Sequence, residues 1–403
     1  MKKILTAMLC VGAAIPAFAA APTPVDLAKK AKSPSEARGY IQQALNDPQF
    51  NNSAETYYVA GKIEMDAYDD GFKTKMINPD DASAQPGTLG NELQAAYEYF
   101  MKALPLDSVP NEKGQVKPKY SKDIVNRLKG HINDYFSVGA DLYNAQQYYP
   151  QAYNAFMVYG DLPTVVLQGL LPEVAPTQIA TAYFNAGLAA NQGGNIDASA
   201  GAFKKARLAG YEQPEATIYE IACWQQIAQQ DESRAKEAQD KIKGAAQFGI
   251  EKFGLENPIF INNLVNSMVS DGEIDQTLAQ LTDLIAQNPN IPNLYGLRAY
   301  VYDQAGKDDL SEQDYRTASA MPNADFETLK NTGNKLYRIG AERLNALEGN
   351  SPEVQAARND IKVNYFQAAK ELANRANALE PGDPYIENLL ESIDYALTTY
   401  FNN

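Results

Sequence analysis

The sequence predicts an all-α protein, a solenoid in which helical hairpins stack on one another, and three observations support this fold class. Small and aromatic residues recur at fixed offsets in several stretches of the chain. Prolines follow the ends of these stretches, where a helix has to stop. Apolar residues make up 45% of the 403 residues, which is enough for a large core. A hairpin has more apolar surface than it can bury alone, so neighbouring hairpins are expected to share one core.

The clearest repeats have small residues where two helices must touch and large residues where they fill the gap. One stretch has Tyr295, Ala299, Tyr302, Ser311, Tyr315 and Ala318. The stretch before it has Ile261, Val265, Met268, Thr277, Leu281 and Leu284. An earlier one has Tyr183, Gly187, Ala190, Ser199, Phe203 and Ala206. In all three, the first small position precedes the second by twelve residues, which predicts the same hairpin three times.

This pattern resembles the tetratricopeptide repeat (TPR), a hairpin of about 34 residues with the same order of aromatic, small and proline positions. Looser copies start at Tyr57, Tyr135, Ile218 and Leu329. The resemblance covers roughly residues 35 to 400. It implies a superhelical solenoid of about seven hairpins plus terminal helices. No unit has Trp at the first aromatic position, which departs from the family pattern.

Two hairpins are expected to contain insertions, because their interval is longer than twelve residues. It is 35 residues between Gly61 and Ala96, and 36 between Gly333 and Ala369. Residues 71–90 are rich in Pro, Gly and Asp and predict a loop. The Ala-, Glu-, Arg- and Leu-rich segment around residues 340–360 instead predicts an extension of both helices of its hairpin.

Four parts are expected along the chain. Residues 1–19 are interpreted as a signal peptide, and residues 20–104 as an N-terminal helical module with the loop insertion. Residues 105–119 contain three Pro and one Gly, which predicts a linker. Residues 120–403 form the main array and end in a capping helix.

The first residues have the pattern of an export signal. Lys2 and Lys3 precede an apolar run, and Ala17 and Ala19 are the small residues that signal peptidase requires. We expect cleavage after Ala19 and a periplasmic location. Leu9 stands before Cys10, where a lipoprotein signal has a small residue, so lipidation is not expected. No later stretch has the roughly 20 apolar residues of a membrane-spanning helix.

The composition leaves few residues for catalysis or metal binding. The chain has one His, two Cys and a net charge of −15, so it lacks zinc-site spacings and the basic surface that nucleic acids require. His131 is interpreted as a surface or capping residue, and Cys223 as a small buried hydrophobe. Pairs such as Asp80-Asp81 are interpreted as helix caps or solvated charge. We expect no enzyme, cofactor, metal or nucleic-acid partner.

The TPR resemblance implies that a peptide or protein partner binds on the concave surface, which the first helix of each hairpin lines. Transferring the groove positions one by one gives, among others, Phe136, Tyr143, Phe184, Asn191, Tyr219, Gln226, Asn262, Asn266, Tyr300, Asp303, Asn334 and Tyr337. These side chains are mostly aromatic or amide. An amide both donates and accepts hydrogen bonds, as a peptide backbone does. The sequence therefore favours an adaptor or scaffold in the cell envelope.

Two other interpretations stay open. One is a homotypic structural protein, in which the chain's own N-terminal segment or another copy of the chain fills the groove. The other is a small-molecule binder or enzyme with its site at the insertion of residues 71–90.

Overall fold

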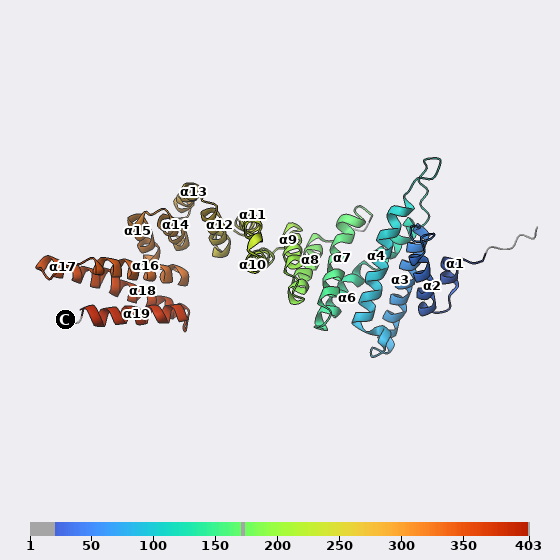
Figure 1. Ribbon diagram of the computed structural model, residues 1–403, viewed down its shortest axis with the longest axis horizontal. Coiled ribbons are helices and arrows are strands. Elements are labelled where there is room, and N and C mark those ends of the chain that lie inside the picture. Colours follow the sequence, from blue (N-terminus) through green and yellow to red (C-terminus); the bar gives the residue numbers. More distant parts are fainter. Residues whose placement is uncertain (1–20, 171–173, 402–403) are drawn as a thin grey trace, which may run out of the picture. The chain divides into compact units, whose positions relative to one another are not determined.

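The computed structural model describes residues 21–170 and 174–401 (Figure 1). The expected signal peptide lies outside this part of the chain. All regular elements of the described residues are helices, which confirms the all-α class. These helices belong to two compact units, Met1–Glu212 and Gln213–Asn403.

The first unit contains helices that pair in chain order. Its helices are α1 (Pro24–Lys30), α2 (Pro34–Asn46), α3 (Ala54–Ile77), α4 (Pro86–Asp107), α5 (Ser121–Gly130), α6 (Ile132–Asn144), α7 (Tyr149–Asp161), α8 (Pro176–Gln192) and α9 (Ile196–Leu208). A π-helical turn, Leu162–Val166, follows α7. The pairs α3–α4, α6–α7 and α8–α9 are helical hairpins, and α1 and α2 pack ahead of them.

The second unit repeats the arrangement four times. Its helices are α10 (Glu215–Gln230), α11 (Ala235–Phe253), α12 (Pro258–Ser270), α13 (Ile274–Gln287), α14 (Pro292–Gln304), α15 (Asp308–Ala320), α16 (Phe326–Asn345), α17 (Pro352–Ile361), α18 (Ala368–Leu379) and α19 (Pro384–Phe401). The hairpins are α10–α11, α12–α13, α14–α15 and α16–α18. With the three of the first unit, they match the seven hairpins that the sequence predicts. Helix α19 packs on α18 as the terminal helix.

Local sequence signals fix where these helices begin and turn. Pro176, Pro258 and Pro292 stand in the first turn of α8, α12 and α14, where the missing N–H leaves no helical bond unmade. Gly272 and Gly306 follow α12 and α14 with φ of 77° and 66°, a backbone conformation that glycine adopts without steric cost. Each hairpin of this pair therefore has a tight turn between its helices.

The small residues of the repeat are contact points for aromatic rings. A Cβ added at Gly187 would lie 2.6 Å from ring carbons of Phe203, and one at Gly61 would lie 2.6 Å from Phe100. At Gly249 the distance to the Phe260 ring would be 2.4 Å. The helices can approach this closely only because these positions carry no side chain.

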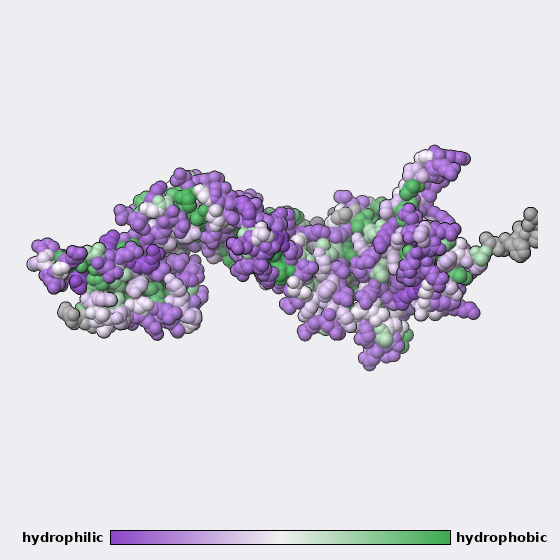
Figure 2. Space-filling model, viewed as in Figure 1, coloured by the Kyte–Doolittle hydropathy of each residue, from purple (hydrophilic) through white to green (hydrophobic). Residues whose placement is uncertain are grey.

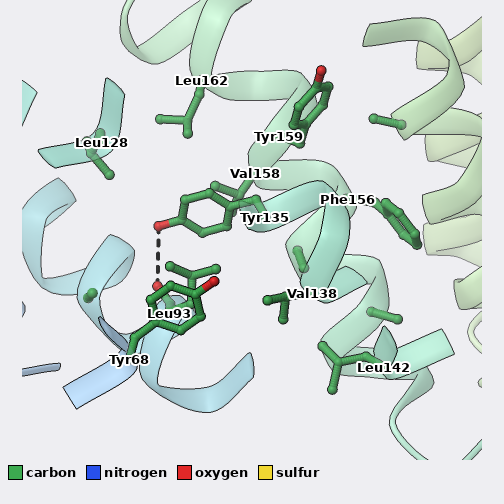
Figure 3. Packing of buried hydrophobic residues seen from close by; sticks show 14 of the residues in the cluster. Tyr68, Leu93, Leu128, Tyr135, Val138, Leu142, Phe156, Val158, Tyr159 and Leu162 are labelled. Atoms are coloured by element: carbon green, nitrogen blue, oxygen red, sulfur yellow. Dashed lines mark hydrogen bonds between the residues drawn. The ribbon is translucent and has the colours of Figure 1, made fainter. Parts of the chain in front are cut away.

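The core of the first unit is continuous across several hairpins (Figure 3). Tyr135 of α6 is fully buried, and its hydroxyl donates a hydrogen bond of 3.3 Å to the carbonyl oxygen of Leu93 in α4. Leu142 and Phe156 extend the same core toward α7. Outside these cores the visible face is mostly hydrophilic (Figure 2), as expected for an acidic chain.

The loop predicted over residues 71–90 is wrong in its extent. Helix α3 continues to Ile77, a short 3₁₀-helix covers Ala82–Ala84, and α4 starts at Pro86. The glycines that suggested a loop are helical contact positions. A Cβ at Gly71 would lie 2.6 Å from the Ser83 carbonyl oxygen, and one at Gly90 would lie 2.8 Å from Leu142. The insertion therefore mainly lengthens two helices.

The other irregular segments also have definite structure. Pro105 lies in the last turn of α4, so the non-helical connection to α5 runs from residue 108 to 120. The expected helix extension near residues 340–360 is present, since α16 continues to Asn345 and α17 starts at Pro352.

Candidate functional site

Four of the aromatic residues predicted for the groove are half-buried and lie against other rings. Phe136 lies edge-on to Phe156 and Tyr159, with ring centroids 5.4 and 5.3 Å apart. The other close pairs are Tyr143 with Tyr149 (5.5 Å), Phe184 with Tyr211 (4.4 Å) and Tyr337 with Phe366 (5.7 Å). Part of each ring thus packs against a neighbouring ring, and only the remaining part is exposed to solvent.

The predicted polar residues differ in exposure. Asn191, Tyr219, Gln226 and Asn266 are exposed, whereas Asn262, Tyr300 and Asn334 are half-buried. Asp303 is engaged in an ion pair, because its carboxylate accepts a hydrogen bond of 2.6 Å from the buried ammonium of Lys335. The structure gives Asp303 a contact within the fold that the sequence pattern does not reveal.

Three of the predicted residues line one hollow in the second unit. This hollow has a volume of about 370 Å³ and lies among α12, α14, α15 and α16. We call it the amide hollow, and its lining residues are Asn262, Asn266, Asn293, Gly296, Leu297, Tyr300, Tyr315, Glu327, Thr328 and Asn331. Besides Asn262, Asn266 and Tyr300, the transferred groove positions include Gly296, and they do not include the other lining residues. The sequence does contain a feature that indicates Asn293: it lies in the first turn of α14, the first helix of its hairpin, which the repeat pattern places along the groove.

The amides of this hollow retain capacity for a ligand. Asn293 donates a hydrogen bond of 2.9 Å from Nδ2 to Oδ1 of Asn262, which leaves the Asn262 amide donors and the Asn293 carbonyl oxygen. Within the described part of the chain, the side chains of Asn266 and Asn331 make no hydrogen bond to another residue. The lining can therefore donate hydrogen bonds to a ligand and accept hydrogen bonds from it at the same time.

Gly296 keeps the hollow open. It lies inside α14, where glycine costs about 1 kcal/mol relative to alanine. A Cβ added there would meet no atom closer than Thr328 Oγ1, at 3.9 Å. Packing therefore does not require a glycine at this position, in contrast to Gly187.

The charge of the hollow is small. Glu327 is its one charged lining residue, and it accepts a hydrogen bond of 2.5 Å from the Lys330 ammonium. Burial raises the pKa of the Tyr315 hydroxyl, and the nearby carboxylate of Asp303 adds to this effect. Tyr315 thus stays protonated at neutral pH and keeps its donor.

Two smaller hollows occur in the first unit. Phe136 lines one of about 300 Å³ together with Asn133, Ser137, Tyr159, Thr177, Gln178 and Thr181. Tyr143 lines one of about 190 Å³ together with Ala140, Asn144, Phe156, Asn185 and Leu188. Two further groove positions predicted from the sequence thus lie at depressions of the surface.

The single histidine is held by the fold. His131 Nε2 lies 2.9 Å from Asp69 Oδ1, and Nδ1 lies 2.8 Å from the Arg127 carbonyl oxygen. Across residues 21–170 and 174–401, no three His, Cys, Asp or Glu side chains are grouped as metal ligands. Among the helices of these residues, none combines the length and apolarity needed to cross a membrane.

Comparison with known proteins finds similarity at the level of structure only. The sequence matches no protein-family model and no curated protein. A "TPR repeats protein" from Bacteroides fragilis is 17% identical, with a TM-score of 0.33, over 65% of this chain and 97% of that one. The P58(IPK) TPR domain is 12% identical, with a TM-score of 0.27, over 94% and 99% of the two chains. Yeast Tom70 is 12% identical, with a TM-score of 0.33, over 93% and 87%.

These values are too low to transfer a ligand or partner to this chain. The assignment of the fold rests on the seven hairpins and on the small-residue contacts between their helices.

Proposed function

We propose that this protein is a non-enzymatic scaffold that binds a polypeptide partner along the first helices of its hairpins, with the amide hollow as a principal contact. One observation carries the proposal. Asn262, Asn266 and Tyr300, chosen from the repeat pattern alone, line a single hollow with Asn293 and Asn331. A location in the cell envelope is part of the proposal and rests on the export signal expected at residues 1–19.

The chemistry of the lining suits an extended peptide. Peptide groups need a donor and an acceptor at each residue, and side-chain amides provide both. Tyr300 adds rigid contact area with a polar end. A volume of about 370 Å³ accommodates one or two side chains of a bound segment. The lone carboxylate of Glu327 favours a neutral or basic segment over an acidic one.

Binding fits this lining better than catalysis does. The amides and hydroxyls of the hollow are weak acids and bases, and the Glu327 carboxylate is paired with Lys330. Such groups recognise a partner without transferring a proton.

The test is a pull-down from envelope extract with the full mature chain as bait. A Gly296→Leu variant fills the hollow without removing an amide, and an Asn262→Ala/Asn266→Ala variant removes amides without filling it. Gly244→Leu is the matched control, because Gly244 is an exposed helical glycine of the same unit and a Cβ there meets no atom within 4 Å. Circular dichroism reports whether each bait is folded.

We expect the wild type and Gly244→Leu to retain the same partner, and both hollow variants to lose it. Capture of that partner by all four folded baits would overturn the proposal.

A further inference from the structure

A further hollow, separate from those described above, lies in the first unit among α1, α2 and α3. Its volume is about 450 Å³, within the range of small-ligand sites. It is lined by Ala28, Lys29, Ala31, Lys32, Ser33, Pro34, Ala37, Tyr58, Val59, Lys62, Ile63 and Asp66. We call it the lysine hollow. Tyr58 and Lys62 are groove positions of the first hairpin in the repeat pattern. The pattern does not predict the hollow itself, because the hollow depends on how α1 packs against α2 and α3.

The inner side of the lysine hollow is apolar and fixed in place. Ala28, Ala37 and Val59 are buried members of the core around them. The Tyr58 hydroxyl donates a hydrogen bond of 2.9 Å to Asp123, and its ring stacks on Tyr120 with centroids 4.6 Å apart. A tyrosine held at both its ring and its hydroxyl presents a rigid apolar face.

The rim carries three lysines, two of which have partners. Lys29 pairs with Glu55, and Lys62 pairs with Asp66 at 2.5 Å. Asp66 is shared, because Arg127 also contacts it at 3.1 Å.

Lys32 differs from the other two lysines. Within the described residues its ammonium has no carboxylate partner. The Glu36 carboxylate accepts the backbone N–H of Lys32 at 2.9 Å and is not part of the lining. The exposed ammonium of Lys32 is therefore available to a ligand at the edge of an apolar surface.

The local charge is opposite to that of the whole chain. The lining itself holds three lysines and a single carboxylate, that of Asp66. The complete chain carries −15. Ser33 and Pro34, at the start of α2, also line the hollow, and the N-terminal end of a helix favours an anion. A ligand here needs an apolar body and one negative charge.

We propose that the lysine hollow binds an amphipathic carboxylate: an apolar chain or side chain on the inner surface, with its carboxylate at Lys32. Two sources have this chemistry, a free organic acid and the C-terminal residue of a polypeptide that ends in an apolar side chain. Both would use the same inner surface and the same ammonium.

The test is isothermal titration calorimetry of the full mature chain with three probes of equal chain length. These are octanoate, octanol and octylammonium, which are negative, neutral and positive. We expect octanoate to bind at one site per chain, octanol to bind about fivefold more weakly, and octylammonium not to bind. Equal binding of octanoate and octanol, or no saturable binding of octanoate, would overturn the proposal.

Variants locate the site. Lys32→Gln should weaken octanoate about fivefold and leave octanol unchanged. Lys30→Gln is the matched control. Lys30 precedes Lys32 by two residues and carries the same charge, but its side chain does not line the hollow. Ala37→Leu fills the inner surface and should abolish binding of octanoate and octanol, whereas Gly39→Ala, on α2 with no atom within 4 Å, should not. Equal effects of Lys32→Gln and Lys30→Gln would contradict a site at Lys32.

A further pair of probes separates the two sources. N-acetyl-Leu-Leu carries a terminal carboxylate, and its amide derivative does not. If N-acetyl-Leu-Leu binds more tightly than octanoate, the ligand is a polypeptide C-terminus. If octanoate binds and N-acetyl-Leu-Leu does not, the ligand is a free organic acid. Because the amide hollow lies in the other unit, failure here leaves the scaffold proposal unaffected.

Discussion

Ser199 Oγ donates a hydrogen bond of 2.9 Å to the backbone carbonyl oxygen of Gly187, and twelve residues along the chain separate the two. The same glycine is covered by the ring of Phe203. The twelve-residue interval of the repeat thus marks the place where the first helix of a hairpin meets the second.

Gly187→Ala should destabilise the first unit. The new Cβ would lie 2.6 Å from the Phe203 ring, and overpacking of this kind costs about 1–3 kcal/mol. Hydrogen exchange of the α8 and α9 amides should show the loss of protection. Gly201→Ala is the control, because this exposed α9 glycine has no atom within 4 Å of an added Cβ and alanine favours a helix. Equal loss of protection in both variants would refute the contact argument.

Asp303→Asn should destabilise the second unit. The Lys335 ammonium is bonded to Asp303 at 2.6 Å and to Asp308 at 3.1 Å, and the Lys335 side chain is only 9% exposed. Asp308 is 77% exposed, so it compensates a buried charge poorly. We expect Asp303→Asn to cost about 3 kcal/mol in the free energy of unfolding and Asp308→Asn much less. Urea unfolding measures both, and equal costs would contradict this difference.

The same ion pairs predict a dependence on alkaline pH. Burial lowers the pKa of Lys335, but the hydrogen bonds from its ammonium to Asp303 and Asp308 outweigh this and raise it overall. A folded pKa above the unfolded value of about 10.4 adds stability that is complete below that pH. This stability is lost as the pH rises through the folded pKa. Above about pH 10.4, wild type should therefore lose stability relative to Lys335→Met, and parallel losses of the two proteins would exclude a role for Lys335.

Asp107→Asn should loosen the connection of residues 108–120. The Asp107 carboxylate accepts hydrogen bonds from the backbone N–H groups of Lys119, Tyr120 and Ser121 at 2.7–2.9 Å, which ties the end of the connection to α4. An amide offers one acceptor oxygen in place of two, so at least one of these bonds is lost. Trypsin should cleave this segment faster in the variant. Glu112→Gln, on the same segment, should leave cleavage at the wild-type rate.

The hairpins could be predicted because the contacts between their helices require particular residue sizes at fixed positions in the sequence. A residue such as Gly187 has to be small and Phe203 has to be large, so their spacing appears as a repeat. The length of α3 could not be predicted in the same way. Gly71 and Gly90 have the composition of a turn, and only their close contacts with Ser83 and Leu142 show that they lie in packed helices.

The candidate sites were predictable only in part. The repeat identifies which helix lines a groove and so finds Asn262, Asn266 and Tyr300. It does not fix how the next helix is placed, so Asn331 of α16 was missed. The lysine hollow was missed for a similar reason, because α1 is a short helix outside the repeat.

Arg298→Lys should weaken the second unit although it keeps the charge. Arg298 donates from Nε and Nη2 to the two carboxylate oxygens of Asp314, at 2.6 and 2.9 Å, and from Nη1 to Thr282 at 3.2 Å. It therefore joins α14 to both α13 and α15, and both members of the ion pair are largely buried. A lysine ammonium cannot match this two-pronged geometry, so we expect a loss of about 1–2 kcal/mol in the free energy of unfolding.

A double-mutant cycle with Asp314→Asn separates the pair from its surroundings. If Arg298 acts mainly through Asp314, the second substitution should add little once the first is present, because the shared bonds are already lost. Urea unfolding of the wild type, both single variants and the double variant measures the coupling. Additive losses would instead mean that Arg298 stabilises α14 through other contacts, such as its hydrogen bond to Thr282.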